Sequence, residues 1–368
     1  MIISDETYIS IKENSLTGRY ITHGQISGFL ENTAFNIETI GRSVEQRTIQ
    51  AIILGTGPQK VLMWSQMHGN ESTTTKAVVD LINYFANDTQ QGEYLLDNCT
   101  IKIIPMLNPD GAEAYTRVNA NGVDLNRDAQ KRTQPESQVL REVYHDFLPN
   151  YCFNLHDQRT IYNVGETDKP ATVSFLSPAF NDNRDLSPAR LKSMALIHAM
   201  NEELQKIIPG QVGRYDDAFN ANCVGDTFQI LETPTVLFEA GHYQGDYQRE
   251  ETRKFVFFAM LKALYTIANG LFKDFNRELY FQIPENNKRF CDILIYNAHV
   301  VDSKRQKDET LGILYHEELA NGKISFNPKI DLQGNLKHFF GHREYDCADE
   351  QSLNALKKDT RIMELIFR

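Results

Sequence analysis

Two hydrophobic patterns alternate along the first 275 residues of the chain. Short apolar runs predict buried strands, and longer segments with apolar residues at helical spacing predict amphipathic helices between them. Strands are expected at 48–54, 60–64, 100–107, 151–155, 172–176 and 235–238. Helices are expected at 72–85, 135–147, 186–207 and 247–271, with a weaker one at 21–30. Strands that alternate with helices in this way favour an α/β fold, with a mixed, mostly parallel sheet flanked by helices.

The pattern changes around residues 272–277. From there on, short segments of alternating apolar and polar residues are separated by Asn, Gly, Pro and Asp. Such segments are typical of strands joined by turns, so they predict a small β-rich domain at the C-terminal end. We therefore expect a large α/β domain at 1–275 and a small β-rich domain at 276–368.

Composition and charge exclude several classes of partner. The chain has 368 residues, and its formal net charge of −11 argues against a nucleic acid or anionic membrane held by bulk charge. No stretch approaches the ~20 apolar residues of a membrane span. Five scattered cysteines without close spacing predict reduced thiols. The first residues lack the features of a secretory signal, so a cytoplasmic protein is expected, with a secreted mature form as the alternative.

Three of the expected strands deliver chemically active side chains at their carboxyl ends. One runs into His-Gly-Asn-Glu, which contains His68 and Glu71, and two others lead directly into His156 and Glu239. A His and a Glu three residues apart are common by chance, but the carboxyl ends of parallel strands meet at one edge of a sheet. Two His and one Glu are the ligand set of an open zinc site, and a further carboxylate can act as a general base. We therefore expect a metal site there, with Glu239 as the base.

A long polar loop at 111–135 offers further candidates. Arg117 and the pair Asn126-Arg127 lie in it, and a loop of this length in a compact domain is usually functional. Arginine can clamp a substrate carboxylate through two hydrogen bonds, or it can stabilise the oxyanion of a tetrahedral intermediate. Asp124 could accept a hydrogen bond from the far nitrogen of a ligand histidine and fix its tautomer.

Several motifs occur together in one order over residues 60–252. They are HGNE, NPDG, the arginine in YTRVNANG, VDLNRD, a later single histidine and a glutamate at the end of an apolar strand. This combination resembles the zinc metallocarboxypeptidases of the carboxypeptidase A type. The resemblance implies a central mixed sheet of eight strands flanked by helices, with one zinc ion per chain. It also implies that residues 1–275 form a catalytic domain of this type.

Carried over to matching positions, the resemblance assigns the metal site. It implies that His68, Glu71 and His156 are the zinc ligands. It further implies that Asp124 is the residue that accepts a hydrogen bond from the His68 nitrogen facing away from the metal.

The same comparison assigns the residues that act on the substrate. It implies that Arg117 polarises the scissile carbonyl and that Asn126 with Arg127 binds a terminal carboxylate. Glu239 would be the general base and later the general acid. The mobile tyrosine of the family precedes the base by about twenty residues, and Tyr215 is the candidate here.

The sequence departs from the family pattern beside the clamp. Many members continue with Asn-Phe or Asn-Trp after LNR, whereas this chain has Asp128-Ala129. Asp128 could therefore change the charge of the carboxylate pocket. For Glu239 the structural alternative is a salt bridge to Arg249 or Arg253.

The predicted function is a zinc-dependent hydrolase that releases the C-terminal residue of a peptide, with zinc-bound water activated by Glu239. The expected partner is a peptide or amide substrate with a free carboxylate. One alternative is an N-acyl amino-acid deacylase of the succinylglutamate desuccinylase/aspartoacylase type, which also carries HGNE, a DLNR-like motif and a C-terminal β domain. A second alternative is a peptide-binding protein without catalysis. The sequence leaves the preferred C-terminal residue and the role of the small domain open.

Overall fold

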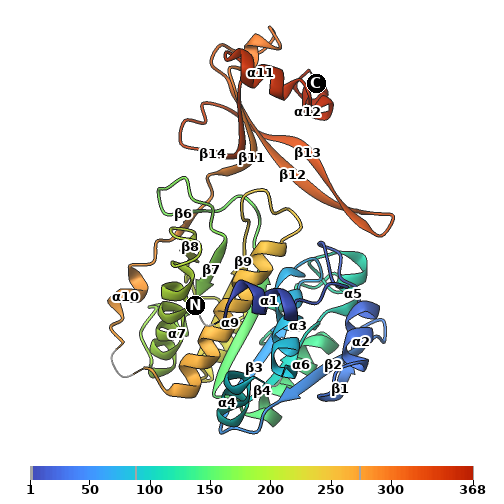
Figure 1. Ribbon diagram of the computed structural model, residues 1–368, viewed down its shortest axis with the longest axis vertical. Helices are drawn as coiled ribbons and strands as arrows, with labels where there is room; N and C mark the ends of the chain where they lie inside the picture. Colours follow the sequence, from blue (N-terminus) through green and yellow to red (C-terminus); the bar gives the residue numbers. More distant parts are fainter. Residues whose placement is uncertain (1–2, 88, 273–274, 368) are drawn as a thin grey trace.

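The computed structural model describes residues 3–87, 89–272 and 275–367, and an eight-stranded sheet forms the centre of its larger part (Figure 1). Its strands are β1 (Asn36–Arg42), β2 (Thr48–Leu54), β3 (Gln59–Ser65), β4 (Cys99–Ile104), β5 (Tyr151–Asp157), β7 (Val173–Leu176), β8 (Val212–Arg214) and β9 (Thr235–Ala240). They lie in the order β1-β2-β4-β3-β5-β9-β7-β8. The pairs β3–β4, β3–β5, β5–β9 and β7–β8 are parallel, and the other three pairs are antiparallel. The predicted mixed, mostly parallel sheet is therefore confirmed.

Helices pack on both faces of this sheet. They are α1 (Asp5–Ile11), α2 (His23–Glu31), α3 (Thr73–Ala86), α4 (Gln90–Asn98), α5 (Pro109–Ala114), α6 (Pro135–Phe147), α7 (Pro188–Leu204), α8 (Val224–Ile230), α9 (Glu250–Asn269) and α10 (Glu278–Phe281). One hydrophobic core contains the buried faces of α3, α7 and α9, and a second core contains those of α6 and α8. Among the described helices none is both long and apolar enough to cross a membrane.

The strongly patterned elements agree with the sequence analysis to within a few residues at each end. The elements that it did not predict are those with weak patterns. Strand β1 lies at the edge of the sheet and its residues are half-buried or exposed in turn, so no apolar run marks it. Helix α4 has an apolar stripe that is only partly buried.

The C-terminal part contains a separate four-stranded sheet in the order β13-β12-β11-β14. Its strands are β11 (Phe290–Tyr296), β12 (Thr310–Ala320), β13 (Lys323–Gly334) and β14 (Phe340–Asp346). Two helices that the sequence analysis did not predict, α11 (Glu350–Leu356) and α12 (Thr360–Ile366), pack against it through a small apolar core. The expected β-rich part is therefore present, with a helical layer added.

The junction between the two parts is gradual. Before β11 begins, α10 contacts α7, and the short strand β10 (Asn286–Asn287) pairs with β6 (Asn163–Val164). Residues just beyond 275 thus still pack on the large part, and the division at 275/276 stays a prediction.

Strands β12 and β13 form a hairpin much longer than the sheet from which it emerges. At the base of the hairpin Thr310 pairs with Gly334, and the pairing continues to the tip, where Ala320 pairs with Lys323. Figure 1 shows this hairpin leaving the small sheet and running down beside the large part, towards the side that carries α5.

A fully buried ion pair joins two helices of the larger core. Asp80 in α3 accepts hydrogen bonds from the guanidinium of Arg253 in α9, and neither side chain is exposed. The Tyr8 hydroxyl donates to Asp80 at 2.9 Å, and Arg253 also donates to the carbonyls of Leu16 and Glu13. The N-terminal segment is thereby fixed to the core through polar groups.

We predict that Asp80→Ala lowers the free energy of unfolding by about 3–5 kcal/mol, because it removes the buried partner of the Arg253 guanidinium and leaves only the partly exposed Glu250, at 3.4 Å, as a charged contact. The matched control is Glu38→Ala, which removes the half-exposed partner of Lys102 and should cost no more than about 1 kcal/mol. Denaturant unfolding of the three proteins measures both values. Equal small losses in the two variants would contradict the importance of the buried pair.

Candidate metal and substrate site

Three buried side chains converge at the carboxyl ends of β3 and β5. His68 follows β3, Glu71 lies in the turn before α3, and His156 lies near the end of β5. The Nδ1 atoms of the two histidines are 3.1 Å apart. Glu71 places Oε1 2.9 Å from His68 Nδ1 and Oε2 2.8 Å from His156 Nδ1. The structure therefore brings the three predicted ligands together.

Two sequence motifs hold this turn in place. A Cβ atom on Gly69 would lie 1.9 Å from the backbone of Gly111, so the HGNE and NPDG segments touch through their glycines. The Asn108 side chain donates to the carbonyl of Met67 at 3.1 Å and accepts from the amide of Gly111 at 2.9 Å. The close approach of the Gly111 backbone is the physical reason for a glycine at position 69, whereas a Cβ on Gly111 would lie 2.5 Å from Asn108 Nδ2 and 2.6 Å from the carbonyl oxygen of Val118.

The donor set fits one metal ion. The ligand atoms of the two histidines and the glutamate all lie within 4.8 Å of one another. Two nitrogens at about 2.05 Å from a tetrahedral zinc ion would be roughly 3.3 Å apart, close to the spacing found here. Burial alone would raise the pKa of Glu71, but the two imidazoles outweigh it and hold that pKa well below its usual range. The site thus keeps its carboxylate charged, as a metal ligand requires.

Asp124 lies behind the ligands and links two of the candidates. Its carboxylate is 3.0 Å from His68 Nε2 and accepts a hydrogen bond of 3.0 Å from Arg117 Nε. Arg117 also donates from Nη1 to Glu71 at 3.2 Å, and its side chain is half-exposed. Both residues therefore lie where the sequence analysis placed them, with the Arg117 guanidinium beside the metal ligands and open to the cleft.

The candidate carboxylate clamp is held by backbone contacts. Asn126 accepts a hydrogen bond from the amide of Val224 through Oδ1 at 3.0 Å, which leaves its amide nitrogen free to face a substrate. Arg127 donates to the carbonyl of Asn126 at 2.8 Å. Asp128, which could have changed the charge of this pocket, instead accepts bonds from the amides of Thr133 and Gln134 at 3.0 Å. It caps the following turn and does not bond to Arg127.

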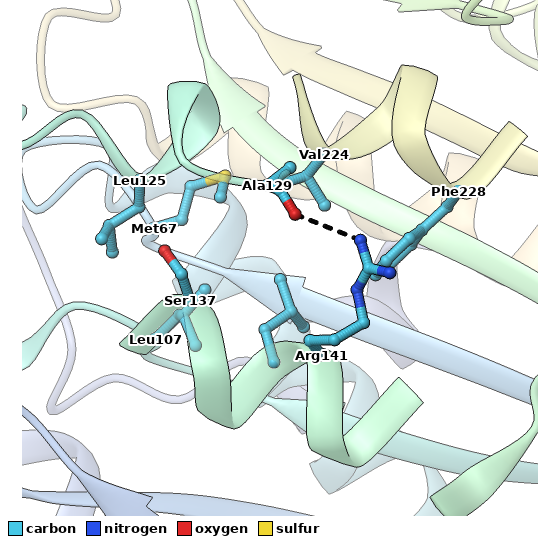
Figure 2. Close-up of a pocket in the computed structure, with 9 residues that line it drawn as sticks. Met67, Leu107, Leu125, Ala129, Ser137, Arg141, Val224 and Phe228 are labelled. Atoms are coloured by element: carbon cyan, nitrogen blue, oxygen red, sulfur yellow. Dashed lines mark hydrogen bonds between the residues drawn. The ribbon is translucent and has the colours of Figure 1, made fainter. Parts of the chain in front are cut away.

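The loop that carries the clamp rests on an apolar layer, which Figure 2 shows. Leu125 and Ala129 flank the clamp and face a small pocket of about 10 Å³, beside Phe228. This is close to the ~10–15 Å³ that one water needs. Arg141 of α6 donates to the carbonyl of Ala129 at 3.1 Å and lies over the Phe228 ring, so it supports the loop from behind.

Glu239 lies on β9 directly opposite His156 in the parallel register of β5 and β9. Burial raises the pKa of its carboxyl well above the usual value, and the nearby charges of Glu71 and Asp157 add to the effect. The alternative of a salt bridge is wrong, because Arg253 pairs with Asp80 and Arg249 donates to the carbonyls of Ala240 and Gln158. Glu239 therefore lines the cleft and makes no ion pair with either arginine.

Tyr215 also borders this cleft. Its ring lies 5.3 Å from that of Tyr162, and its amide donates to the carbonyl of Phe175 at 2.9 Å. Burial raises the pKa of Tyr215 above its usual range, and the charge of Glu239 adds to the rise. The residue is therefore near the predicted base, and its role as the mobile tyrosine stays a prediction.

The cleft is lined by more residues than the sequence analysis predicted. Its volume is about 800 Å³. All of the predicted site residues line it except Asp124, which lies behind His68. The sequence analysis missed Asn154, which is fully buried and has neither side-chain polar atom hydrogen-bonded within the described structure. The period of two along β5 could have found it, because Asn154 and His156 point to the same face of the sheet.

Comparison with known proteins agrees with this geometry. Residues 31–167 match a family model described as zinc carboxypeptidase. A probable carboxypeptidase 2 of Arthroderma benhamiae is 25% identical over 154 residues, which is 40% of this chain and 28% of that protein. Carboxypeptidase M of Mus musculus is 28% identical over 160 residues, which is 35% of this chain and 36% of that protein. The chain thus matches only about a third of the length of these relatives.

Solved structures share the fold. A metallo-carboxypeptidase from Burkholderia cenocepacia superimposes with a TM-score of 0.55 at 20% identity, over 67% of this chain and 69% of the other. Carboxypeptidase A from Helicoverpa armigera gives a TM-score of 0.51 at 15% identity, over 73% of this chain and 80% of the other. The resemblance to the zinc metallocarboxypeptidases is therefore confirmed, by sequence over residues 31–167 and by fold over about two thirds of the chain.

Proposed function

We propose that this protein is a zinc-dependent carboxypeptidase, which hydrolyses the last peptide bond of a peptide with a free terminal carboxylate. The observation that carries the proposal is the meeting of His68, Glu71 and His156 with Glu239 at one edge of the sheet, where Glu239 forms no ion pair with any residue that the structure describes. The chemistry that a zinc ion supplies at such a site is Lewis acidity towards a carbonyl and a lowered pKa of water. The names of the matching proteins do not favour the deacylase alternative.

The residues of the chain divide the remaining work. Arg127 and Asn126 bind the terminal carboxylate and fix the position of the last peptide bond. Arg117, held in orientation by Asp124, donates hydrogen bonds to the carbonyl oxygen as it becomes an oxyanion. Glu239 takes a proton from the attacking water and passes it to the nitrogen of the leaving amine, so the new C–O bond forms and the C–N bond breaks.

The first prediction concerns the base. Glu239→Gln should lower kcat/KM by about 10²–10⁴-fold, because the amide cannot accept the proton. The metal content should not change, since Glu239 is not among the candidate ligands. Steady-state hydrolysis of a short peptide, with elemental analysis of the same samples, measures both. The matched control is Glu232→Gln, an exposed glutamate just before β9. Turnover that persists in purified Glu239→Gln would remove the residue from its assigned role.

The second prediction concerns the clamp. Arg127→Met keeps the length of the side chain and removes the charged fork, which should cost about 1.5–3 kcal/mol of discrimination between a free and an amidated C-terminus. The ratio of kcat/KM for a peptide and its C-terminal amide measures this discrimination. Arg132→Met, on an exposed arginine of the same loop, is the control. A ratio equal to that of the unaltered protein would show that the carboxylate binds elsewhere.

The third prediction concerns metal affinity. Asp124→Asn should weaken zinc binding by about 10–100-fold, because the His68 ring loses its charged partner. Competition against a coloured chelator measures the affinity. Asp128→Asn is the control, since Asp128 bonds to the backbone of the next turn and not to the site. Equal zinc affinity of the two variants would contradict the supporting role of Asp124.

A further inference from the structure

The small C-terminal part contributes residues to the cleft of the large part. Tyr315, His316 and Glu317 of β12 and Phe326 of β13 line the same cavity as His68, Glu71 and His156. These residues are more than two hundred positions from the first metal ligand in the sequence. The β12–β13 hairpin therefore forms one wall of the candidate active site.

The outer half of the hairpin is fixed to the large part by polar contacts. Glu317 Oε1 lies 3.5 Å from Nη2 of the buried Arg19, and Glu317 Oε2 accepts a hydrogen bond from the Tyr115 hydroxyl. Arg19 lies at the same time 3.8 Å from the carboxylate of Asp157, which directly follows His156. A continuous line of charged groups thus connects the hairpin to the strand that carries a metal ligand.

A second contact fixes the hairpin nearer its base. Buried Asp292 of β11 accepts a hydrogen bond from the amide of Tyr315 at 2.7 Å and another from the hydroxyl of Tyr247 at 2.9 Å. The Tyr247 ring lies 5.2 Å from that of Tyr315 and 5.5 Å from that of Phe326. Two separate anchors of this kind keep the hairpin in one position over the cleft.

The wall and the clamp contact different parts of the large domain. The hairpin bonds to Arg19 and Tyr115, while Arg127 contacts Asn126 and lies close to Cys223. Once the terminal carboxylate binds at Arg127, the residues on the other side of the scissile bond have to extend away from the clamp. The hairpin lines the same cleft as the clamp, so it is placed to meet these residues.

We propose that the β12–β13 hairpin restricts the substrates of this protein to short peptides, of about two or three residues. The proposal rests on the carboxypeptidase function proposed above and names its substrate class. A cavity of about 800 Å³ lies within the ~300–1,000 Å³ of pockets that enclose small ligands. A longer peptide has to displace the hairpin and break the Glu317 contacts. The hairpin therefore excludes long substrates sterically.

A length series tests the proposal. Peptides with the same C-terminal dipeptide and two to eight residues are hydrolysed by the zinc-loaded protein, and kcat/KM is compared across the series. We expect the value to fall by at least roughly tenfold between the tripeptide and the octapeptide. In Glu317→Ala the ratio of these two values should move towards one. Glu317→Gln, which can still accept the Tyr115 hydrogen bond, should lie between the two proteins.

Glu318→Ala is the matched control, because Glu318 is the next residue on β12, is exposed and bonds to Asn327 within the hairpin. It should leave the length ratio unchanged. Tyr115→Phe removes one of the two contacts of this anchor from the large part and leaves the Arg19 contact, which provides a second, milder variant if Glu317→Ala folds poorly. Hydrogen exchange supplies a readout without substrate, since loss of the anchor should deprotect the amides of β12 beyond Tyr315.

The outcomes separate the two proposals. Equal kcat/KM for short and long peptides in the unaltered protein would overturn the exclusion and leave the carboxypeptidase function standing. A strong length dependence that Glu317→Ala and Tyr115→Phe do not alter would also overturn it. No hydrolysis of a peptide of any length by the zinc-loaded protein would overturn the proposed function and the exclusion together.

Discussion

The charged carboxylate of Glu71 is the constraint on which the rest of the site depends. A carboxylate can remain ionised in a buried position only if its oxygens are paired. Glu71 meets this condition through His68, His156 and the backbone amide of Asp157, which donates to Oε2 at 3.1 Å. These partners come from two strands that are neighbours only in the folded sheet. The pairing of β3 with β5 is therefore a condition for the ionisation state of Glu71 as well as for the shape of the site.

Asp157 shows how that condition extends into the surrounding fold. Its carboxylate accepts hydrogen bonds from the amides of Thr73 and Thr74 at the first turn of α3, where the Ser72 side chain makes no capping bond. A negative charge at a helix N-terminus is also favoured by the helix dipole. Because Asp157 is supplied by β5, the start of α3 and the second histidine ligand are positioned by the same strand.

The sequence predicted the parts of this arrangement that depend on local pattern. Apolar runs located β3, β5 and β9, and the residues that follow each strand gave the metal and base candidates. The long polar loop gave Arg117 and the clamp as candidates, and resemblance to a known family assigned their separate roles. Weakly patterned elements such as β1 were missed because an edge strand buries too little apolar surface to mark its position. The alternative of a salt bridge for Glu239 was wrong, because the sequence does not show which acid pairs with a buried arginine.

The contribution of the hairpin was beyond sequence reasoning for a different reason. Alternation along β12 predicts a strand, but nothing local indicates that its exposed half lies against Arg19. That contact joins residues separated by 317 − 19 = 298 positions. Pairings of this range close large loops, and they have no periodic signature in the sequence.

The long separation between Arg19 and Glu317 has a consequence for biosynthesis. Chains are made from the N-terminus at about 5–20 residues per second, and domains generally fold as units while synthesis continues. Glu239 and the metal ligands leave the ribosome well before β12, so the large domain can assemble its ligands while one side of the cleft is still open. The hairpin can close that side only after β12 and β13 have been made, so the metal ligands can come together before this wall of the cleft is added.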